Sequence, residues 1–151
     1  MSPSVPRHIL VPHDFSETAQ SALAFALDLA GKLGAHITLL HVYDVPAYAY
    51  GEGAALTVDF LGRIRSAAQT ALEVVATRAR RPDVEIDVLL RQGSAWSEID
   101  ACAKESSVDL IVLGTHGRHG LARVLLGSVA EKVVRTAPCP VLTVHGPEGA
   151  P

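Results

Sequence analysis

The stretch from Gly114 to Ser128 carries the residues whose types and spacing are best suited to binding chemistry. Gly114 and Gly117 open it, and Gly127 directly precedes Ser128 at its end. Glycines let a backbone approach an anion closely, successive N–H groups can form an anion-binding nest, and a serine hydroxyl adds a donor. The pattern therefore favours a phosphate site, although tight turns alone would also use glycines. It matches neither the P-loop nor the Gly-x-Gly-x-x-Gly dinucleotide motif.

Two other segments place polar and main-chain groups where they could share this site. His13 and Asp14 follow an apolar run that ends at Pro12, and Val42 ends a second apolar run. Ligands of open α/β sheets bind beyond the carboxyl ends of the strands, where the strand order reverses. If these strands are neighbours, their ends and the glycine-rich stretch line one crevice. The alternative is that Asp14 only holds a turn or caps a helix, and that His13 is a plain turn residue.

Histidines, arginines and a serine within the glycine-rich stretch are weaker candidates. His116 and His119 stand three residues apart, but no third ligand lies nearby, so we do not expect a metal site of their own. Arg118 and Arg123 are suited either to reach phosphates or to remain solvated at the surface. The alternative for Ser128 is a helix-interior hydroxyl that bonds back to the main chain.

The elements that must position these residues alternate between strand and helix periodicity. Short apolar runs predict strands, and apolar residues at helical spacing predict the helices between them. Strands are expected at residues 8–12, 36–42, 84–90, 110–113 and 140–144, and helices at residues 17–33, 54–81, 94–106 and 121–136. A glycine-rich loop is expected at residues 114–120. Ser16 and Gly34 are suited to cap the first helix, and Pro82 ends the second.

Strand–helix alternation at this spacing is typical of right-handed βαβ units and one parallel sheet. The expected fold class is α/β: a single doubly wound open sheet of five parallel strands in the order 3-2-1-4-5, with four helices on both faces. No repeat and no long linker divides the 151 residues. We therefore expect one domain over residues 1–151, with a flexible tail at residues 146–151.

Composition and charge exclude several classes of function. With 48% hydrophobic and 19% charged residues the chain is globular, and no apolar run approaches the ~20 residues of a membrane span. A net charge of −3 argues against a general nucleic-acid binder. Cys102 and Cys139 stand far apart, which favours neither a disulfide framework nor a zinc site. Without a signal-peptide pattern, the expected location is the cytoplasm.

The spacing Gly-x2-Gly-x9-Gly-Ser resembles the ATP-binding motif of universal stress proteins, with Gly114, Gly117, Gly127 and Ser128 at the required positions. Other parts of the chain are similar to typical segments of that family, and the resemblance covers nearly the whole chain. These segments are Ile9–Ser16, Leu40–Val42, Asp109–Gly114, Leu126–Ala130 and Ala137–Leu142.

The resemblance implies a role for each matching residue. Asp14 would face the ribose and the phosphate-bound metal, and the main chain of Val42 would meet the adenine. Pro12 and His13 would line the base pocket, Leu113 and Gly114 would border the ribose, and Gly117, Gly127, Ser128 and Val129 would hold phosphates. The full set of expected nucleotide-binding residues is Pro12, His13, Asp14, Val42, Leu113, Gly114, Thr115, His116, Gly117, Arg118, Gly127, Ser128 and Val129. The family often has a small residue in place of His13, so this imidazole is expected to narrow the pocket or to add a hydrogen bond.

The function that the resemblance implies is that of a cytoplasmic stress-response sensor or regulatory module that binds ATP, or ADP or AMP, together with Mg²⁺. The sequence supplies no nucleophile elbow, no paired bases and no arginine finger, so at most slow ATP hydrolysis is expected. The alternatives are a weak ATP hydrolase and a dimeric interaction protein that binds no nucleotide. The intact glycine motif argues against the second alternative.

The last predicted strand is also a candidate interface. Its residues Val141 to Val144 are uncharged, and the terminal strand of a doubly wound sheet is expected to lie at an edge. An edge strand exposes unpaired N–H and C=O groups, which pairing with a second copy would satisfy. We therefore expect a homodimer through this strand, which the resemblance also implies. The alternative is a monomer whose edge is covered by the tail from Gly146 to Pro151.

Overall fold

Residues 4–45, 54–115 and 126–146 are described by the computed structural model, in which strands and helices alternate along the chain. The strands are β1 (His8–Pro12), β2 (His36–Tyr43), β3 (Ile86–Gln92), β4 (Leu110–Thr115) and β5 (Val141–His145). The helices are α1 (Glu17–Leu33), α2 (Ala54–Ala79), α3 (Ala95–Glu105) and α4 (Ser128–Thr136). The expected alternation of strand and helix is confirmed.

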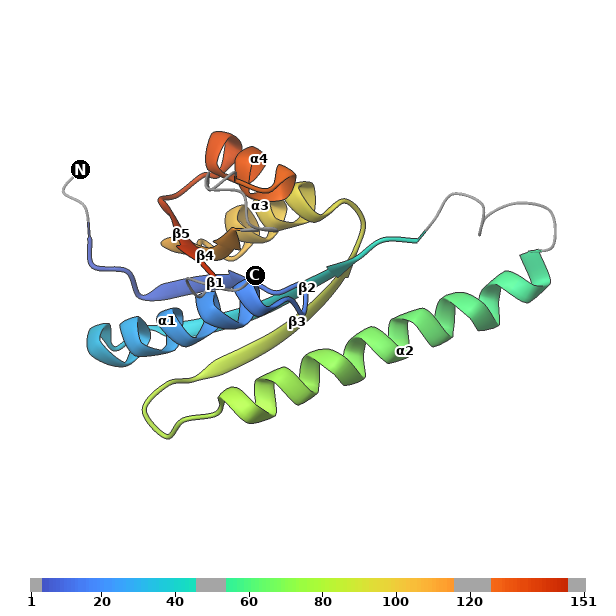
Figure 1. The fold of residues 1–151 in the computed structure, drawn as a ribbon, viewed down its shortest axis with the longest axis horizontal. Coiled ribbons are helices and arrows are strands. Elements are labelled where there is room, and N and C mark those ends of the chain that lie inside the picture. The colour runs from blue at the N-terminus through green and yellow to red at the C-terminus, as the bar shows by residue number, and fades with distance from the viewer. Residues whose placement is uncertain (1–3, 46–53, 116–125, 147–151) are drawn as a thin grey trace.

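The described strands form one parallel sheet in the order β3-β2-β1-β4-β5, as predicted. Helices α1 and α2 cover one face of the sheet, and α3 and α4 cover the other (Figure 1). The strand order reverses between β1 and β4, because the chain moves outward from β1 through β2 to β3 and then returns to the other side of β1. The crevice above β1 and β4 is therefore the place where a ligand is expected.

Alternating residues of the central strands divide the hydrophobic core into two halves. On β1, Ile9 and Val11 pack toward α1 and α2, whereas Leu10 packs toward α3 and α4. Ile111 on β4 joins the second half, and all four side chains are fully buried. Because a parallel strand covered on both faces needs apolar side chains on both, these runs are continuous rather than alternating with polar residues.

Helix α1 is held at both ends by the residues that the sequence indicated. The Ser16 hydroxyl accepts a hydrogen bond from the Ala19 N–H at 3.1 Å, which satisfies one of the unpaired donors of the first turn. Gly34 adopts φ +67° at the other end, and its N–H donates to the Ala30 carbonyl. Only glycine takes this left-handed conformation without steric cost, so the helix ends there.

Several strand boundaries differ from the prediction by one or two residues, and two of these differences have a clear structural cause. Strand β3 begins at Ile86 rather than at residue 84, because Val84 is engaged in a short antiparallel bridge with Arg81. Strand β4 continues through Gly114 and Thr115, which were expected to begin a glycine-rich loop. Both residues pair with β5, whose register places Val144 beside Gly114 and His145 beside Thr115.

Helix α4 begins at Ser128, whereas the apolar pattern predicted a start near residue 121. Leu126 and Gly127 are not helical, and Gly127 is the N-cap with φ −60° and ψ 161°. Residues 116–125, which include Gly117, His116 and Arg118, lie outside the described part of the chain. The correction places Ser128 in the first turn of α4, so the alternative of a helix-interior hydroxyl is also wrong.

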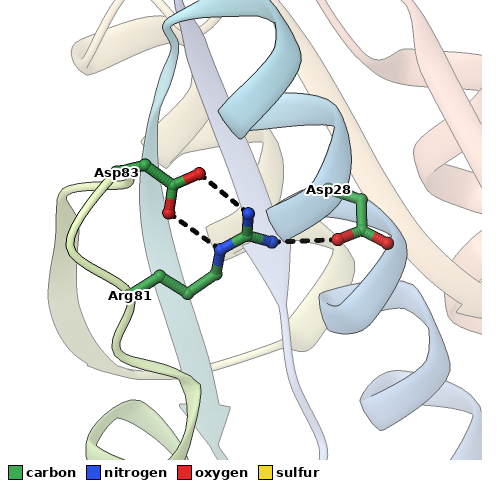
Figure 2. Close-up of polar contacts among 3 residues, drawn as sticks. All are labelled: Asp28, Arg81 and Asp83. Atoms are coloured by element: carbon green, nitrogen blue, oxygen red, sulfur yellow. Dashed lines mark hydrogen bonds and ion pairs between the residues drawn. The ribbon is translucent and has the colours of Figure 1, made fainter.

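A three-residue ion cluster fixes the end of α2 against α1. Arg81 donates to Asp28 of α1 and makes two parallel hydrogen bonds with Asp83, at 2.8 and 2.9 Å (Figure 2). The cluster lies against Gly31 of α1, where an added Cβ would come within 2.8 Å of the Asp83 carboxylate. The cluster is largely exposed, so its contribution is mainly to the geometry of the α2–β3 connection.

The cysteines are free thiols. Cys102 is buried, Cys139 is half-buried, and burial raises the pKa of both thiols. Within the described residues no group of three or more histidine, cysteine, aspartate or glutamate side chains is placed to hold a metal ion. Among the same residues no helix combines the length and the apolar character that crossing a bilayer requires.

Candidate functional site

An open cavity lies over the carboxyl ends of β1, β2 and β4, where the strand order reverses. The cavity and its open mouth together contain about 580 Å³ of empty space. The residues that line it are Pro12, His13, Asp14, Ser16, Thr18, Ala19, Leu40, Val42, Ala95, Ile99, Leu113, Gly114, Val129 and Ala130. They come from strand ends and from the first turns of three helices.

One side of the cavity is apolar and faces α3 and α4. Its walls include Leu40, Leu113 and Ile99, each of which is buried, together with the half-buried Val42 at the end of β2. Val42 and Leu113 were predicted as site residues, and both line this side. An apolar slot with few side-chain polar groups suits a flat, weakly polar ring such as a nucleobase, with selectivity left to main-chain groups.

Three helix N-termini also border the cavity. Residues from the first turns of α1, α3 and α4 line it, with Ala95 beginning α3 and Val129 near the start of α4. The N-cap residues of α3 and α4, Ser94 and Gly127, make no side-chain capping bond. Because the first N–H groups of a helix are unpaired and carry the positive end of its dipole, this arrangement attracts an anion.

Asp14 stands at the rim, inside a compact turn between β1 and α1. Its Oδ1 accepts a hydrogen bond from the Ser16 N–H at 3.0 Å and a second one from the Ser16 hydroxyl. The Ser16 hydroxyl also lies 3.0 Å from the hydroxyl of Thr18. Asp14, Ser16 and Thr18 all line the cavity. The carboxylate thus organises the turn and belongs to the site, so the turn-residue alternative and the binding role are compatible.

Close packing of β4 against α1 requires a glycine at position 114. A Cβ at this position would lie 2.5 Å from the main-chain oxygen of Thr18 and 2.9 Å from the Ala19 nitrogen. Those are backbone atoms of the first turn of α1, so they cannot move aside as a flexible side chain would. The glycine allows β4 to approach α1 closely, and this approach shapes the cavity that both elements line.

Thr115 points away from the cavity, although the resemblance placed it in the site. Its side chain is fully buried, and its hydroxyl lies 2.8 Å from His145 Nδ1 on β5. Gly127 and Ser128 stand at the start of α4 without lining the cavity themselves, whereas Val129 does line it. Positions 116–118 of the expected set are outside the described residues.

His13 is among the residues that line the cavity, and its ring adds a hydrogen bond within the turn, from the Phe15 N–H to Nδ1. The ring is buried, and its neighbours are Phe15, His41 and Gln20, none of which lines the cavity. Burial lowers the pKa of the His13 imidazole, an effect that the nearby Gln20 amide partly offsets. Nε2 has no partner with hydrogen-bond geometry, so Gln20 is close enough to act electrostatically without forming a well-aligned bond.

Sequence reasoning missed the contributions of α3 and of the first turn of α1. Ala95 and Ile99 line the cavity from α3, and Thr18 and Ala19 line it from α1. Their residue types are those of ordinary helix surfaces, so composition gives no indication of a site. A usable indication was their position, because each stands in the first turns of a helix that follows a strand of a parallel sheet.

A doubly wound parallel sheet with a partly apolar cavity at its switch point, bordered by helix N-termini, defines an α/β domain with a candidate small-ligand site. The family model described as universal stress protein family matches residues 6–145 of this chain. The chain therefore belongs to the universal stress protein family.

Individual relatives agree with this assignment. Universal stress protein MJ0531 of Methanocaldococcus jannaschii is 35% identical over 144 residues, which cover 94% of this chain and 84% of the relative. The solved structure of the hypothetical protein MJ0577, from the same organism, aligns with a TM-score of 0.82 at 27% identity and covers 97% of this chain and 100% of that one. A family member from Arabidopsis thaliana, solved with AMP bound, aligns with a TM-score of 0.67 at 21% identity over 95% of this chain and 94% of its own.

Proposed function

We propose that this chain binds an adenine nucleotide, ATP with Mg²⁺ foremost, and serves as a stress-response sensor or regulatory module. The observation that carries the proposal is the presence in one cavity of an apolar slot and three helix N-termini. A nucleotide offers a matching pair of features, since its base is flat and weakly polar and its phosphates are anionic. The AMP held by the Arabidopsis family member supports the adenine class.

The metal would come with the nucleotide rather than from a preformed cage. Asp14 is the acidic residue among those that line the cavity, and the described residues contain no cluster of three potential ligands. Mg²⁺ commonly binds through one or two carboxylates together with substrate phosphates, so a single carboxylate fits this mode. Asp14 would hold the metal ion, and Mg²⁺ would neutralise phosphate charge at the rim.

The proposed activity is binding rather than efficient catalysis. The described lining residues include one carboxylate and no lysine or arginine that would stabilise the charge of a transferring phosphoryl group. A module of this kind signals by changing its state when the nucleotide binds. The free cysteines favour a reducing compartment, and we propose the cytoplasm as the location.

A homodimer through β5 is the second part of the proposal. This strand forms one edge of the described sheet, and its residues Val141, Leu142, Thr143 and Val144 are each only partly buried. An uncharged, partly exposed edge strand is suited to pair with a second copy. The assembly would join two sheets across a two-fold axis.

Filling the cavity from α3 tests nucleotide binding. Ala95 lines the cavity at the start of α3, so Ala95→Phe should place a ring in the slot and weaken Mg-ATP binding at least tenfold by calorimetry. Ala101 lies on the same helix without lining the cavity, so Ala101→Phe is the matched control and should bind as the parent does. A parent protein that binds neither ATP, ADP nor AMP, or an Ala95→Phe variant with unchanged affinity, would overturn the proposal.

A further inference from the structure

The turn between β1 and α1 contains a strained residue directly beside the candidate site. Phe15 adopts φ +68°, a left-handed conformation that is costly for a bulky side chain. Asp14 and Ser16, on either side of it, both line the cavity. Such a conformation persists only when its surroundings enforce it, so the contacts of Phe15 decide how the rim of the site is held.

His13 supplies the first of these contacts through its own ring. The Phe15 N–H donates to His13 Nδ1 at 3.0 Å. Because an amide nitrogen can only donate here, Nδ1 is the acceptor and the ring proton of the neutral imidazole resides on Nε2. The ring is only 4% exposed, so this hydrogen bond is shielded from competing water.

A second imidazole secures the same turn from β2. His41 Nδ1 lies 2.7 Å from the His13 carbonyl, so His41 donates through Nδ1. The Phe15 ring lies 4.3 Å from the His41 ring and 5.6 Å from the His13 ring, measured between centroids. The His13 N–H in turn donates to the Leu40 carbonyl at 2.7 Å. The main-chain N–H, the main-chain carbonyl and the ring Nδ1 of His13 therefore all form hydrogen bonds that fix this turn.

We propose that His13 is a positioning residue for the nucleotide site, acting on the Phe15 amide through the acceptor Nδ1. By holding the Phe15 amide it fixes the left-handed conformation, and this conformation sets the direction in which Asp14 and Ser16 face the cavity. The inference rests on the proposed function, because the site it positions is the one proposed to bind the nucleotide. A residue that merely filled space would be replaceable by any side chain of similar size.

Two substitutions of His13 distinguish the effect of its hydrogen-bond acceptor from the effect of its side-chain volume. In His13→Asn the Oδ1 atom is attached to Cγ, as Nδ1 is in histidine, and asparagine readily accepts a hydrogen bond from the amide two residues on. In His13→Gln the acceptor moves one bond further out, to the position of Nε2, and no longer reaches the Phe15 amide. Both variants are polar and uncharged, so a difference between them reports the position of the acceptor.

The first measurement is hydrogen exchange of the Phe15 amide by NMR, together with the ¹⁵N coupling across the hydrogen bond to His13 Nδ1 in the parent. We expect the coupling in the parent, slow exchange in the parent and in His13→Asn, and faster exchange in His13→Gln. Equal exchange in all three proteins would overturn the inference, since the acceptor would then not hold the turn.

The second measurement is Mg-ATP affinity by calorimetry on the same three proteins. We expect His13→Asn to bind within about twofold of the parent and His13→Gln to bind about three- to tenfold more weakly, the range of one lost hydrogen bond. Equal affinity of the two variants would overturn the positioning role. A parent that binds no adenine nucleotide refutes the proposed function instead, and the exchange measurement then decides the role of His13 by itself.

Discussion

Asp14 joins the turn after β1 to the rim of the cavity, and its task in the turn is separable from its proposed task in binding because the two use different properties of the carboxylate. Holding the turn needs an acceptor atom, since Oδ1 receives the Ser16 N–H and hydroxyl. Binding a metal or a ribose hydroxyl benefits from the negative charge. An asparagine at this position keeps the acceptor and removes the charge.

We therefore expect Asp14→Asn to weaken Mg-ATP binding about 10- to 100-fold with little change in the melting temperature. Hydrogen bonds to charged groups contribute ~1.5–3 kcal/mol, which gives this range of affinity. Calorimetry and thermal melting on the same samples measure the two effects. Asp14→Ala is the comparison variant, because it should lose both affinity and stability. Unchanged affinity in Asp14→Asn would show that Asp14 acts in the turn alone.

Local chemistry made some of these residues predictable. Ser16 and Gly34 were identified as caps because the types of residue that satisfy helix ends are few. Asp14 and Val42 were identified from their positions at strand ends and from the family resemblance, and the structure places both on the cavity. The contacts of His13 were not predictable, because they involve Phe15 and also His41, 28 residues further along the chain.

At the scale of elements, the close approach of β4 to α1 decides the shape of the site. Gly114 allows the approach, and β4 extends through it because β5 pairs alongside. The sequence indicated a loop at this point since glycine and threonine follow a short apolar run. Pairing between distant segments overrode that local preference, as is common for strand ends.

The contribution of the close approach of β4 to α1 to stability can be tested at two glycines, one crowded by its neighbours and one with open space around it. Gly114→Ala should destabilise the fold by about 1–3 kcal/mol, because the new methyl group meets the main chain of Thr18. Gly62 lies within α2 with nothing within 4 Å of an added Cβ, so Gly62→Ala should stabilise the protein by ~0.5–1 kcal/mol. Urea unfolding measures both. A Gly114→Ala variant as stable as the parent would show that α1 can move away from β4 and accommodate the methyl group.

The start of α4 also differs from the prediction. The apolar pattern suggested that the helix begins near residue 121, but the backbone at Gly127 is extended and α4 begins at Ser128. Periodicity locates a helix better than it locates its ends, because apolar residues outside a helix can also pack against a core. The correction matters for function, since it puts the unpaired N–H groups of α4 beside the cavity.

At the scale of the whole molecule, the order of the sheet leaves β5 at an edge. The Ile111 N–H donates to the Pro140 carbonyl, so the main-chain groups of alternate residues, including Leu142, face β4. The main-chain groups of Val141 and Thr143 consequently face outward, available to a second copy. Fold class, strand order and the edge position of β5 were predictable because strand–helix alternation leaves few arrangements, whereas which of its main-chain groups face outward depends on the register with β4.

Light scattering at tens of micromolar should report about twice the 15.9 kDa mass of the chain. Thr143→Pro removes an outward N–H without touching the ladder to β4, so it should shift the mass toward that of a monomer. Thr143→Val, which keeps the N–H, is the control and should remain dimeric. A monomeric parent, or a dimeric Thr143→Pro variant, would refute pairing through β5.

The single proton of the Ser16 hydroxyl decides which groups on this part of the cavity rim donate hydrogen bonds and which accept them. That proton is donated to Asp14, so toward Ala19 and Thr18 the oxygen of Ser16 can only accept, and the Thr18 hydroxyl must donate to it. The chain of hydroxyls therefore runs one way, from Thr18 through Ser16 to the carboxylate, and this part of the rim offers electron pairs rather than free protons. This part of the rim would favour a sugar hydroxyl or a cation over a phosphate oxygen, so in the proposed complex the phosphates would lie toward the starts of α3 and α4.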